Sequence, residues 1–264
     1  MSIVLGAFLP HAPLLLPTAD AAHHKKMQAA ALASAHVAAL VYAAQVDTVV
    51  LFNPHAVSVG NTFTFNQSAN ILARFEELGD LSTALQAKGA PTFAHRLKEK
   101  LEPRFPVATS IFDSVNYGMG IPMLAFQKLP RQPQWLEISA RRSTVADHET
   151  FGVALQAELI NAQHRIAVIA TGDVTAGLTE ASPQGKMQGA NALRLGWSSA
   201  VKRNVLADFL RGLPPDQVET MAACGVWSAA QLLGTLNTLR TKVEVHYDGA
   251  PHGVAYQVIT WLPA

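Results

Sequence analysis

The segment Phe8-Leu9-Pro10-His11-Ala12-Pro13 has a counterpart further along the chain, Leu51-Phe52-Asn53-Pro54-His55-Ala56. Each segment closes an apolar run of the kind that is typical of buried strands. Proline restricts the residue before it to extended geometry and cannot donate a hydrogen bond to a sheet, so we expect each strand to end at its proline. His11 and His55 are therefore predicted to begin loops at the carboxyl ends of strands.

The position of these two histidines suggests a shared ligand, because open α/β sheets bind ligands at the carboxyl ends of their strands. An alanine-rich helix is expected between them, from about residue 21 to 44. The two strands should then be parallel neighbours joined by a right-handed crossover. His11 and His55 could hold one metal ion between them, and the pattern leaves open that they are two unrelated loop histidines.

Composition restricts the class of protein. The chain has 264 residues, of which 49% are hydrophobic and 15% charged, which predicts a globular chain of one domain or two closely joined domains. We expect a single domain over residues 1–264. Lysine and arginine number 20 against 19 acidic residues with no basic block, so nucleic acid is not expected as a partner. The single cysteine, Cys224, excludes an internal disulfide and favours a reducing, cytoplasmic location. Prolines interrupt the apolar start of the chain, which predicts neither a signal peptide nor a membrane span.

Strand and helix patterns alternate along the chain, which predicts an α/β fold: a single-domain sandwich with a central mixed, largely parallel sheet flanked by helices. In the less regular part, residues 56–106, we expect one strand followed by short helices. The expected short helices cover residues 69–78, 81–88 and 92–101. Residues 243–247 and 254–261 are predicted to form a closing antiparallel hairpin with its turn at Asp248-Gly249.

Several polar residues beside predicted strands are candidates for a site. Tyr117 lies in a glycine-rich loop after a strand, where it could reach a pocket or bond to backbone. Asp173 follows the buried strand that begins at Ile166, where it could bond to loop backbone or orient a metal-binding histidine. His148 and His164 flank an amphipathic helix and are expected to be exposed.

Taken together, six stretches in order over residues 3–261 resemble the class III extradiol ring-cleavage dioxygenases of the subunit-B type and their Memo-like relatives. Two of these stretches are the strand-Pro-His segments quoted above. The others are Asn116-Tyr-Gly-Met-Gly-Ile-Pro-Met, Ile169-Ala-Thr-Gly-Asp-Val-Thr-Ala, Ala223-Cys-Gly-Val-Trp-Ser with the following Leu232-Leu-Gly-Thr-Leu, and Tyr247-Asp-Gly-Ala-Pro-His-Gly-Val-Ala-Tyr.

The resemblance implies a site that this sequence only partly keeps. Active family members hold Fe(II) with two histidines and a carboxylate, and a further histidine acts as acid and base on a catechol-like or aminophenol-like ring. The two ligand histidines match His11 and His55. The carboxylate position falls on Ala223, the acid-base histidine on Ala176 and another pocket histidine on Tyr117. Ala176 cannot carry a proton, and Ala223 cannot neutralise a metal.

Two residues could replace the missing third ligand. Cys224 directly follows the alanine, and Memo-like relatives use a cysteine in a comparable Cys-Gly segment; Glu219 lies one helical turn before the same alanine. We favour Cys224 as the third ligand. The alternative that Cys224 is an inert buried thiol stays open. A His-His-Cys set would favour Zn(II) or copper over an oxygen-activating Fe(II) centre. His252 could add an imidazole to the pocket or be a plain loop residue.

Three hypotheses follow. The chain is a divergent dioxygenase that opens a small aromatic substrate, with Tyr117 or His252 handling protons. Alternatively it is a catalytically silent metal-binding homologue, either the partner of a homologous subunit or a Memo-like regulator. In the third, the fold is metal-free and its pocket serves a small ligand or an interface. We also expect the chain to form a homodimer or to pair with a homologous subunit.

Overall fold

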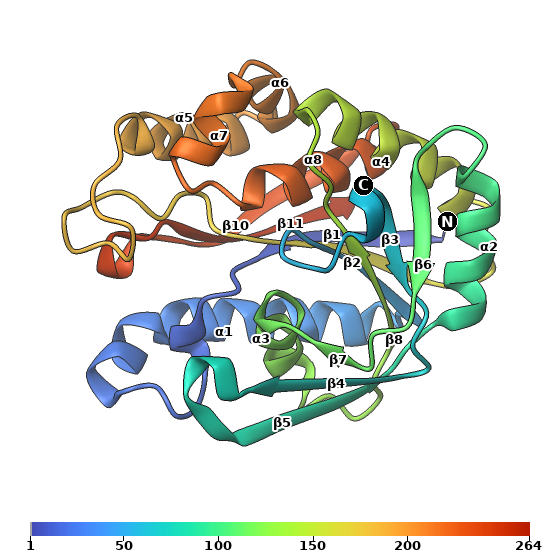
Figure 1. The fold of residues 1–264 in the computed structure, drawn as a ribbon, viewed down its shortest axis with the longest axis horizontal. Coiled ribbons are helices and arrows are strands. Elements are labelled where there is room, and N and C mark those ends of the chain that lie inside the picture. The colour runs from blue at the N-terminus through green and yellow to red at the C-terminus, as the bar shows by residue number, and fades with distance from the viewer. Residues whose placement is uncertain (1) are drawn as a thin grey trace.

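The computed structural model describes residues 2–264 and shows an eight-stranded sheet through the middle of the molecule (Figure 1). Its strands are β1 (Ile3–Leu9), β2 (Thr48–Asn53), β3 (Phe63–Asn66), β6 (Val107–Ser110), β8 (Gln134–Ser139), β9 (Ile166–Thr171), β10 (Thr241–Gly249) and β11 (Tyr256–Pro263). They lie in the order β10-β11-β1-β9-β2-β8-β3-β6.

The four central strands β1, β9, β2 and β8 are parallel to one another. β11 pairs antiparallel with β1, and β3 pairs antiparallel with β8, so the sheet is mixed. The predicted fold class is confirmed, with one correction. β1 and β2 are parallel but are not neighbours, because β9 lies between them. All six residues of β9 have no exposed surface, so this apolar strand takes the centre of the sheet, a pairing between distant segments that local sequence does not reveal.

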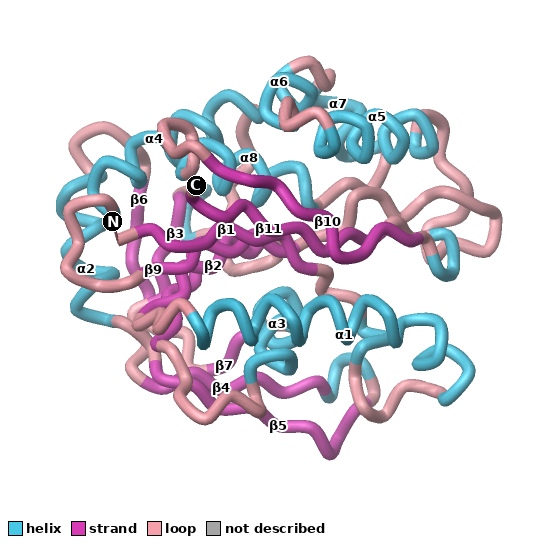
Figure 2. Tube along the Cα trace, turned by 180° about the vertical axis from the view of Figure 1, so that it is seen from behind, coloured by secondary structure: helices cyan, strands magenta, loops and turns pink. Residues whose placement is uncertain are grey.

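Helices cover both faces of the sheet, as Figures 1 and 2 show. Side chains alternate between the faces along each central strand: Val50 and Phe52 join one core cluster, while Val49 and Leu51 join the other. The first cluster is covered by α2 (Pro91–Leu101), α4 (Val145–Leu159), α5 (Ala190–Lys202), α6 (Leu206–Arg211), α7 (Pro215–Thr220) and α8 (Gly225–Thr235); α1 (Ala21–Ala43) and α3 (Tyr117–Phe126) cover the second. Short 3-10 turns are η1 (Pro13–Leu15), η2 (Val59–Asn61), η3 (Glu76–Leu78) and η4 (Pro251–Gly253).

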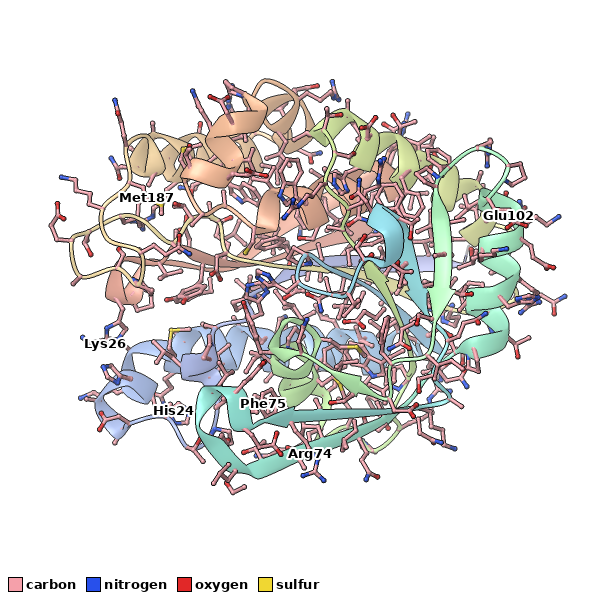
Figure 3. The ribbon with its side chains drawn as sticks, viewed as in Figure 1. His24, Lys26, Arg74, Phe75, Glu102 and Met187 are labelled. Atoms are coloured by element: carbon pink, nitrogen blue, oxygen red, sulfur yellow. The ribbon has the colours of Figure 1, made fainter. Side chains whose placement is uncertain are left out.

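A second sheet of three strands forms an additional layer beyond α1 and α3 (Figure 2). It consists of β4 (Asn70–Phe75), β5 (Asp80–Lys88) and β7 (Ser114–Val115), in the order β5-β4-β7. The helices predicted over residues 69–78 and 81–88 are therefore wrong. Burial along β4 alternates with the period of a strand, so that Phe75 is fully buried while Arg74 points away from the molecule (Figure 3).

The closing hairpin is confirmed, since β10 and β11 pair antiparallel. β10 continues through Asp248-Gly249, and η4 makes the connection in place of the predicted tight turn. Within residues 2–264 no helix combines the length and the apolar character that crossing a membrane requires.

The central strands end level with one another. Leu9 of β1 pairs with Thr171 of β9, and Asn53 of β2 pairs with Ser139 of β8. The loops that follow these four strands leave the sheet side by side, and we call this region the carboxyl edge. Both predicted ligand histidines lie in these loops.

Candidate metal centre

His11 lies in the loop directly after β1 and is only 2% exposed. Its Nδ1 lies 3.2 Å from the hydroxyl of Thr171, the last residue of β9. This contact engages one ring nitrogen and directs the other, Nε2, to the opposite side. On that side are the Sγ of Cys224 at 3.5 Å and the Oδ1 of Asp173 at 3.7 Å.

Cys224 reaches this place because two glycines allow its loop to approach β9 closely. A Cβ on Gly172 would lie 2.2 Å from the Cα of Gly225, so a side chain there would separate the two segments. With glycine present, the N–H of Gly225 donates to the carbonyl of Asp173 at 3.0 Å. The N–H of Asp173 in turn donates to Sγ of Cys224 at 3.3 Å. The Thr-Gly-Asp and Cys-Gly stretches of the sequence therefore pack against each other.

His55 is held by asparagines from two elements. Its backbone N–H donates to Oδ1 of Asn53 at 3.0 Å, and its carbonyl accepts from the side chain of Asn116. The amide of Asn53 donates to Oδ1 of Asn116 at 3.0 Å and to the buried Glu137 at 2.7 Å. This network fixes the loop so that the ring of His55 lies 4.9 Å from that of His11, measured between centroids.

The structure therefore brings together His11, His55 and Cys224, the three residues predicted to bind metal. One ligand atom from each lies within 4.8 Å of the other two. Two imidazole nitrogens and one sulfur form a donor set for Zn(II), copper or Fe(II). Asp173 adds a fourth feature, because its Oδ1 is buried and has no hydrogen-bond partner among the described residues. A bound cation would satisfy that oxygen, so the residues present fit a metal ion.

Burial controls the protonation of this group. It lowers the pKa of His11 well below its usual value, and the nearby His55 lowers it further. Burial also lowers the pKa of His55, so both rings are neutral, the form that binds metal. Burial raises the pKa of the Cys224 thiol, and the charge of Asp173 adds to this; a metal ion acts in the opposite direction by stabilising the thiolate. Burial also raises the pKa of Asp173 to about 7.

Tyr117 lies beside both imidazoles. It begins α3, where the side chain of Asn116 caps the helix by accepting from the N–H of Gly118 at 2.9 Å. Its ring centroid is 5.4 Å from that of His11 and 5.2 Å from that of His55. Burial, and then the charges of Cys224, Asp173 and Glu77, raise its pKa to about 12, so the phenol stays protonated. Its catalytic role remains a prediction.

His252 lies elsewhere. In η4 it has a left-handed backbone with φ of 55° and packs against His23 of α1, with ring centroids 4.6 Å apart. It does not belong to the group of His11, His55 and Cys224. Its part in proton handling stays a prediction.

The remaining residues considered in the sequence lie outside the group of His11, His55 and Cys224. Ala223 and Ala176 are buried methyl groups, at 1% and 8% exposure. Glu219 is exposed and stands outside the metal-binding group. His148 was expected at the surface and is instead fully buried. The reason is that α8 and β3 supply Trp227 and Phe63, whose rings pack against it.

Sequence reasoning missed three supporting residues: Thr171, Asn53 and Asn116. A signal for the first two was present, since each is a polar residue that ends a strand directly after an apolar run. Such a residue places its side chain at the carboxyl edge, where it can orient a ligand.

Comparison with known proteins shows the family of the chain. The family model for the catalytic LigB subunit of aromatic ring-opening dioxygenase matches residues 5–258. The chain belongs to this family. The resemblance inferred from the sequence is therefore confirmed, and the LigB family consists of metal-dependent proteins that act on aromatic rings.

Two similar proteins were also found. Protein CA_C1420 of Clostridium acetobutylicum is 22% identical over 267 residues, which cover 95% of this chain and 56% of that protein. The chain thus spans about half the length of this curated relative. The crystal structure of the uncharacterized protein JW3007 from Escherichia coli K12 matches with a TM-score of 0.64 at 15% identity, covering 98% of this chain and 99% of that one. At this identity the second likeness shows the fold alone.

Proposed function

We propose that this LigB-family protein binds a metal ion through His11, His55 and Cys224 and opens a catechol-like or aminophenol-like ring. One observation carries the proposal: donor atoms from three distant parts of the chain lie within 4.8 Å of one another at the carboxyl edge. The family supplies the reaction class, oxidative opening of an aromatic ring.

The choice of metal follows from the donors. Fe(II) is the metal that the family resemblance implies, and a sulfur ligand shifts preference towards Zn(II) or copper. When bound, the ion supplies a Lewis acid for the ring oxygens and, as iron, the capacity to react with dioxygen. The protein's part is orientation: Thr171 holds the ring of His11, and Asn53 with Asn116 holds the loop of His55.

Proton handling is assigned to the groups beside the imidazoles. Oδ1 of Asp173 lies 3.7 Å from Nε2 of His11, so its carboxyl group is placed to exchange a proton with a substrate bound at the metal. Tyr117 keeps its proton and can donate a hydrogen bond to a substrate oxygen. Asp173 and Tyr117 would together take over the function of the family's acid-base histidine, whose position is occupied here by Ala176. His252 packs against His23, so we do not assign the step to it.

A second candidate function is a catalytically silent metal-binding homologue. The observation that favours it is that Ala223 and Ala176 are buried methyl groups. The family's carboxylate position therefore carries no charge, and its acid-base position has no proton to exchange. In this case the protein would serve as the partner of a homologous subunit or as a regulator.

The test begins with metal content, measured by mass spectrometry on protein purified without oxygen. We expect near one ion per chain in the wild type and loss in H55A and C224A, with the exposed H95A on α2 as control. Protein loaded with Fe(II) is then given oxygen with catechol, protocatechuate or 2-aminophenol, and a yellow product reports ring opening. Metal without ring opening supports the silent homologue. Failure to bind Fe(II), Zn(II) and Cu(I) alike would overturn both candidates.

A further inference from the structure

Glu137 is an acidic residue inside the central sheet. It stands in β8 between the apolar residues Leu136 and Ile138 and is only 4% exposed. Because side chains alternate along a strand, it shares with Trp135 the face that α1 and α3 cover. No lysine, arginine or histidine forms an ion pair with it in the part of the chain that the structure describes. A buried acid without a cationic partner lowers stability, so packing does not account for its presence here.

Two asparagine amides face the carboxyl group of Glu137, and both present their N–H groups to it. Nδ2 of Asn53 donates to Oε1 at 2.7 Å, and the amide of Asn66 donates to the carboxyl group as well. The oxygens of both amides are already engaged. Oδ1 of Asn53 accepts from the N–H of His55 at 3.0 Å, and Oδ1 of Asn66 accepts from the N–H of Ser68 at 2.9 Å.

This arrangement requires an acid rather than an amide at position 137. An ionised carboxylate accepts at both of its oxygens, whereas a glutamine would oppose one of the two asparagines with its own N–H groups. Burial raises the pKa of Glu137, and the hydrogen bonds from Asn53 and Asn66 oppose this shift because they stabilise the ionised form. The carboxylate is therefore the group that satisfies both neighbours.

Asn53 connects the carboxyl group of Glu137 to the loop of His55. Its amide nitrogen also donates to Oδ1 of Asn116 at 3.0 Å, and Asn116 in turn donates to the carbonyl of His55. If the amide of Asn53 turned over, its nitrogen would face the N–H of His55. Its oxygen would then face the oxygens of Glu137 and Asn116. Glu137 therefore stabilises the one orientation in which both asparagines hold the His55 loop.

We propose that Glu137 is a positioning residue for the candidate metal centre: its carboxylate fixes the orientation of Asn53 and, through Asn53, the placement of His55. The inference rests on the proposed function for its consequence, which is tighter metal binding. The placement of the His55 loop itself is a property of the metal-free protein. Glu137 touches neither His55 nor the other two predicted ligands, and it acts on the site from inside the sheet.

The first measurement is amide hydrogen exchange on metal-free protein, followed by NMR. In E137Q we expect the protection of the His55 N–H to fall about ten-fold, because its acceptor on Asn53 loses its orientation. The N–H of Val50 in β2 serves as the reference for global stability, so the result is the ratio of the two protection factors. D80N is the matched control, since Asp80 is a buried acid of β5 that accepts from backbone N–H groups outside the metal centre. It should keep the ratio.

The second measurement is metal binding by the same variants. E137Q should bind zinc about ten-fold more weakly in competition with a chelator. The visible absorption bands of bound Co(II) should also shift, because they depend on ligand geometry; a loss of stability alone leaves the bands of the folded protein unchanged. D80N should match the wild type in both readouts. E137D keeps two acceptor oxygens but withdraws them, so it should lie between the wild type and E137Q, and it carries the test if E137Q does not fold.

The inference is overturned if E137Q keeps the exchange ratio, or if D80N changes it equally. It is also overturned if the wild type binds zinc and E137Q binds it with the same affinity. The fate of the proposed function is read separately. If the wild type binds no metal while E137Q loses the protection of His55, the placement by Glu137 stands and the proposed function fails. If the wild type binds metal and E137Q matches it in every readout, the proposed function stands and the role of Glu137 fails.

Discussion

Two histidines of this protein are almost completely buried, His11 at the carboxyl edge and His148 in α4. Burial lowers the pKa of both, and for His148 it lowers the pKa to about 4. Their surroundings differ. The rings of Phe63 and Trp227 pack against His148. Its one hydrogen bond joins Nε2 to the carbonyl of Arg141 at 3.1 Å.

His11, in contrast, has a hydroxyl at one nitrogen and the Cys224 sulfur and the Asp173 carboxyl group at the other. Burial alone makes an imidazole neutral but does not make it a metal ligand. A ligand needs one nitrogen oriented by a hydrogen bond and the other facing further donors. We therefore expect His148 to be structural and His11 to be functional.

The same substitution at both histidines tests this contrast with the largest expected effect. H11F should reduce metal content from near stoichiometric to background, because it removes one of three ligands while keeping a ring of similar size. H148F should keep the metal. Mass spectrometry on both variants, with circular dichroism to check folding, makes the comparison. Metal loss in both or in neither would remove the distinction.

The next test concerns the side chain that holds the His55 loop in place. N116A removes the amide that donates to the carbonyl of His55, and we expect metal affinity to fall about 10- to 100-fold. The substitution also removes the cap of α3, worth about 1 kcal/mol. T144A removes the corresponding cap of α4 and serves as the matched control. Competition with a chelator measures affinity, and equal values for the two variants would contradict a role for Asn116 at the centre.

We expect Thr171 to contribute somewhat less than Asn116 to metal affinity. T171V deletes the hydroxyl that faces Nδ1 of His11, and about a ten-fold loss of metal affinity is expected, since His11 stays in place by packing. The chain offers a matched control in T260V, which deletes a hydroxyl 2.8 Å from Nε2 of His246. If both variants bind metal as the wild type does, the orientation of His11 does not depend on Thr171.

His148 should show its role in the pH dependence of stability. Its pKa is about 4 in the folded protein and about 6.5 when unfolded, so below pH 6.5 the unfolded chain takes up a proton that the folded chain does not. Its contribution is fully present above pH 6.5 and is lost as pH falls towards 4. Denaturation of metal-free protein should give an unfolding free energy that falls by up to about 1.4 kcal/mol per pH unit more in the wild type than in H148F. Parallel curves would contradict this.

The sequence predicted the parts of the site that depend on local rules. Proline ends a strand wherever it stands in the chain, so the placement of His11 and His55 at the carboxyl edge followed directly. The third predicted ligand, Cys224, required the family resemblance, because its position depends on the contact between Gly172 and Gly225. No local pattern shows that two such segments meet.

The errors have the same physical origin. β4 and β5 carry residues that tolerate a helix, and their pairing with each other and with β7 decided their conformation. The insertion of β9 between β1 and β2 is likewise a pairing between distant segments. The burial of His148 depends on Trp227, which lies far away in the sequence. Each of these is a tertiary contact, which single-segment reasoning does not include.

The central claim, that His11, His55 and Cys224 hold one metal ion, is tested most directly by X-ray absorption on zinc-loaded protein. We expect one sulfur at about 2.3 Å and two nitrogens at about 2.0–2.1 Å from the zinc, and loss of the sulfur in C224S. A zinc shell of nitrogen and oxygen alone in the wild type would contradict the claim. The cysteine would then be an inert thiol beside a pair of imidazoles.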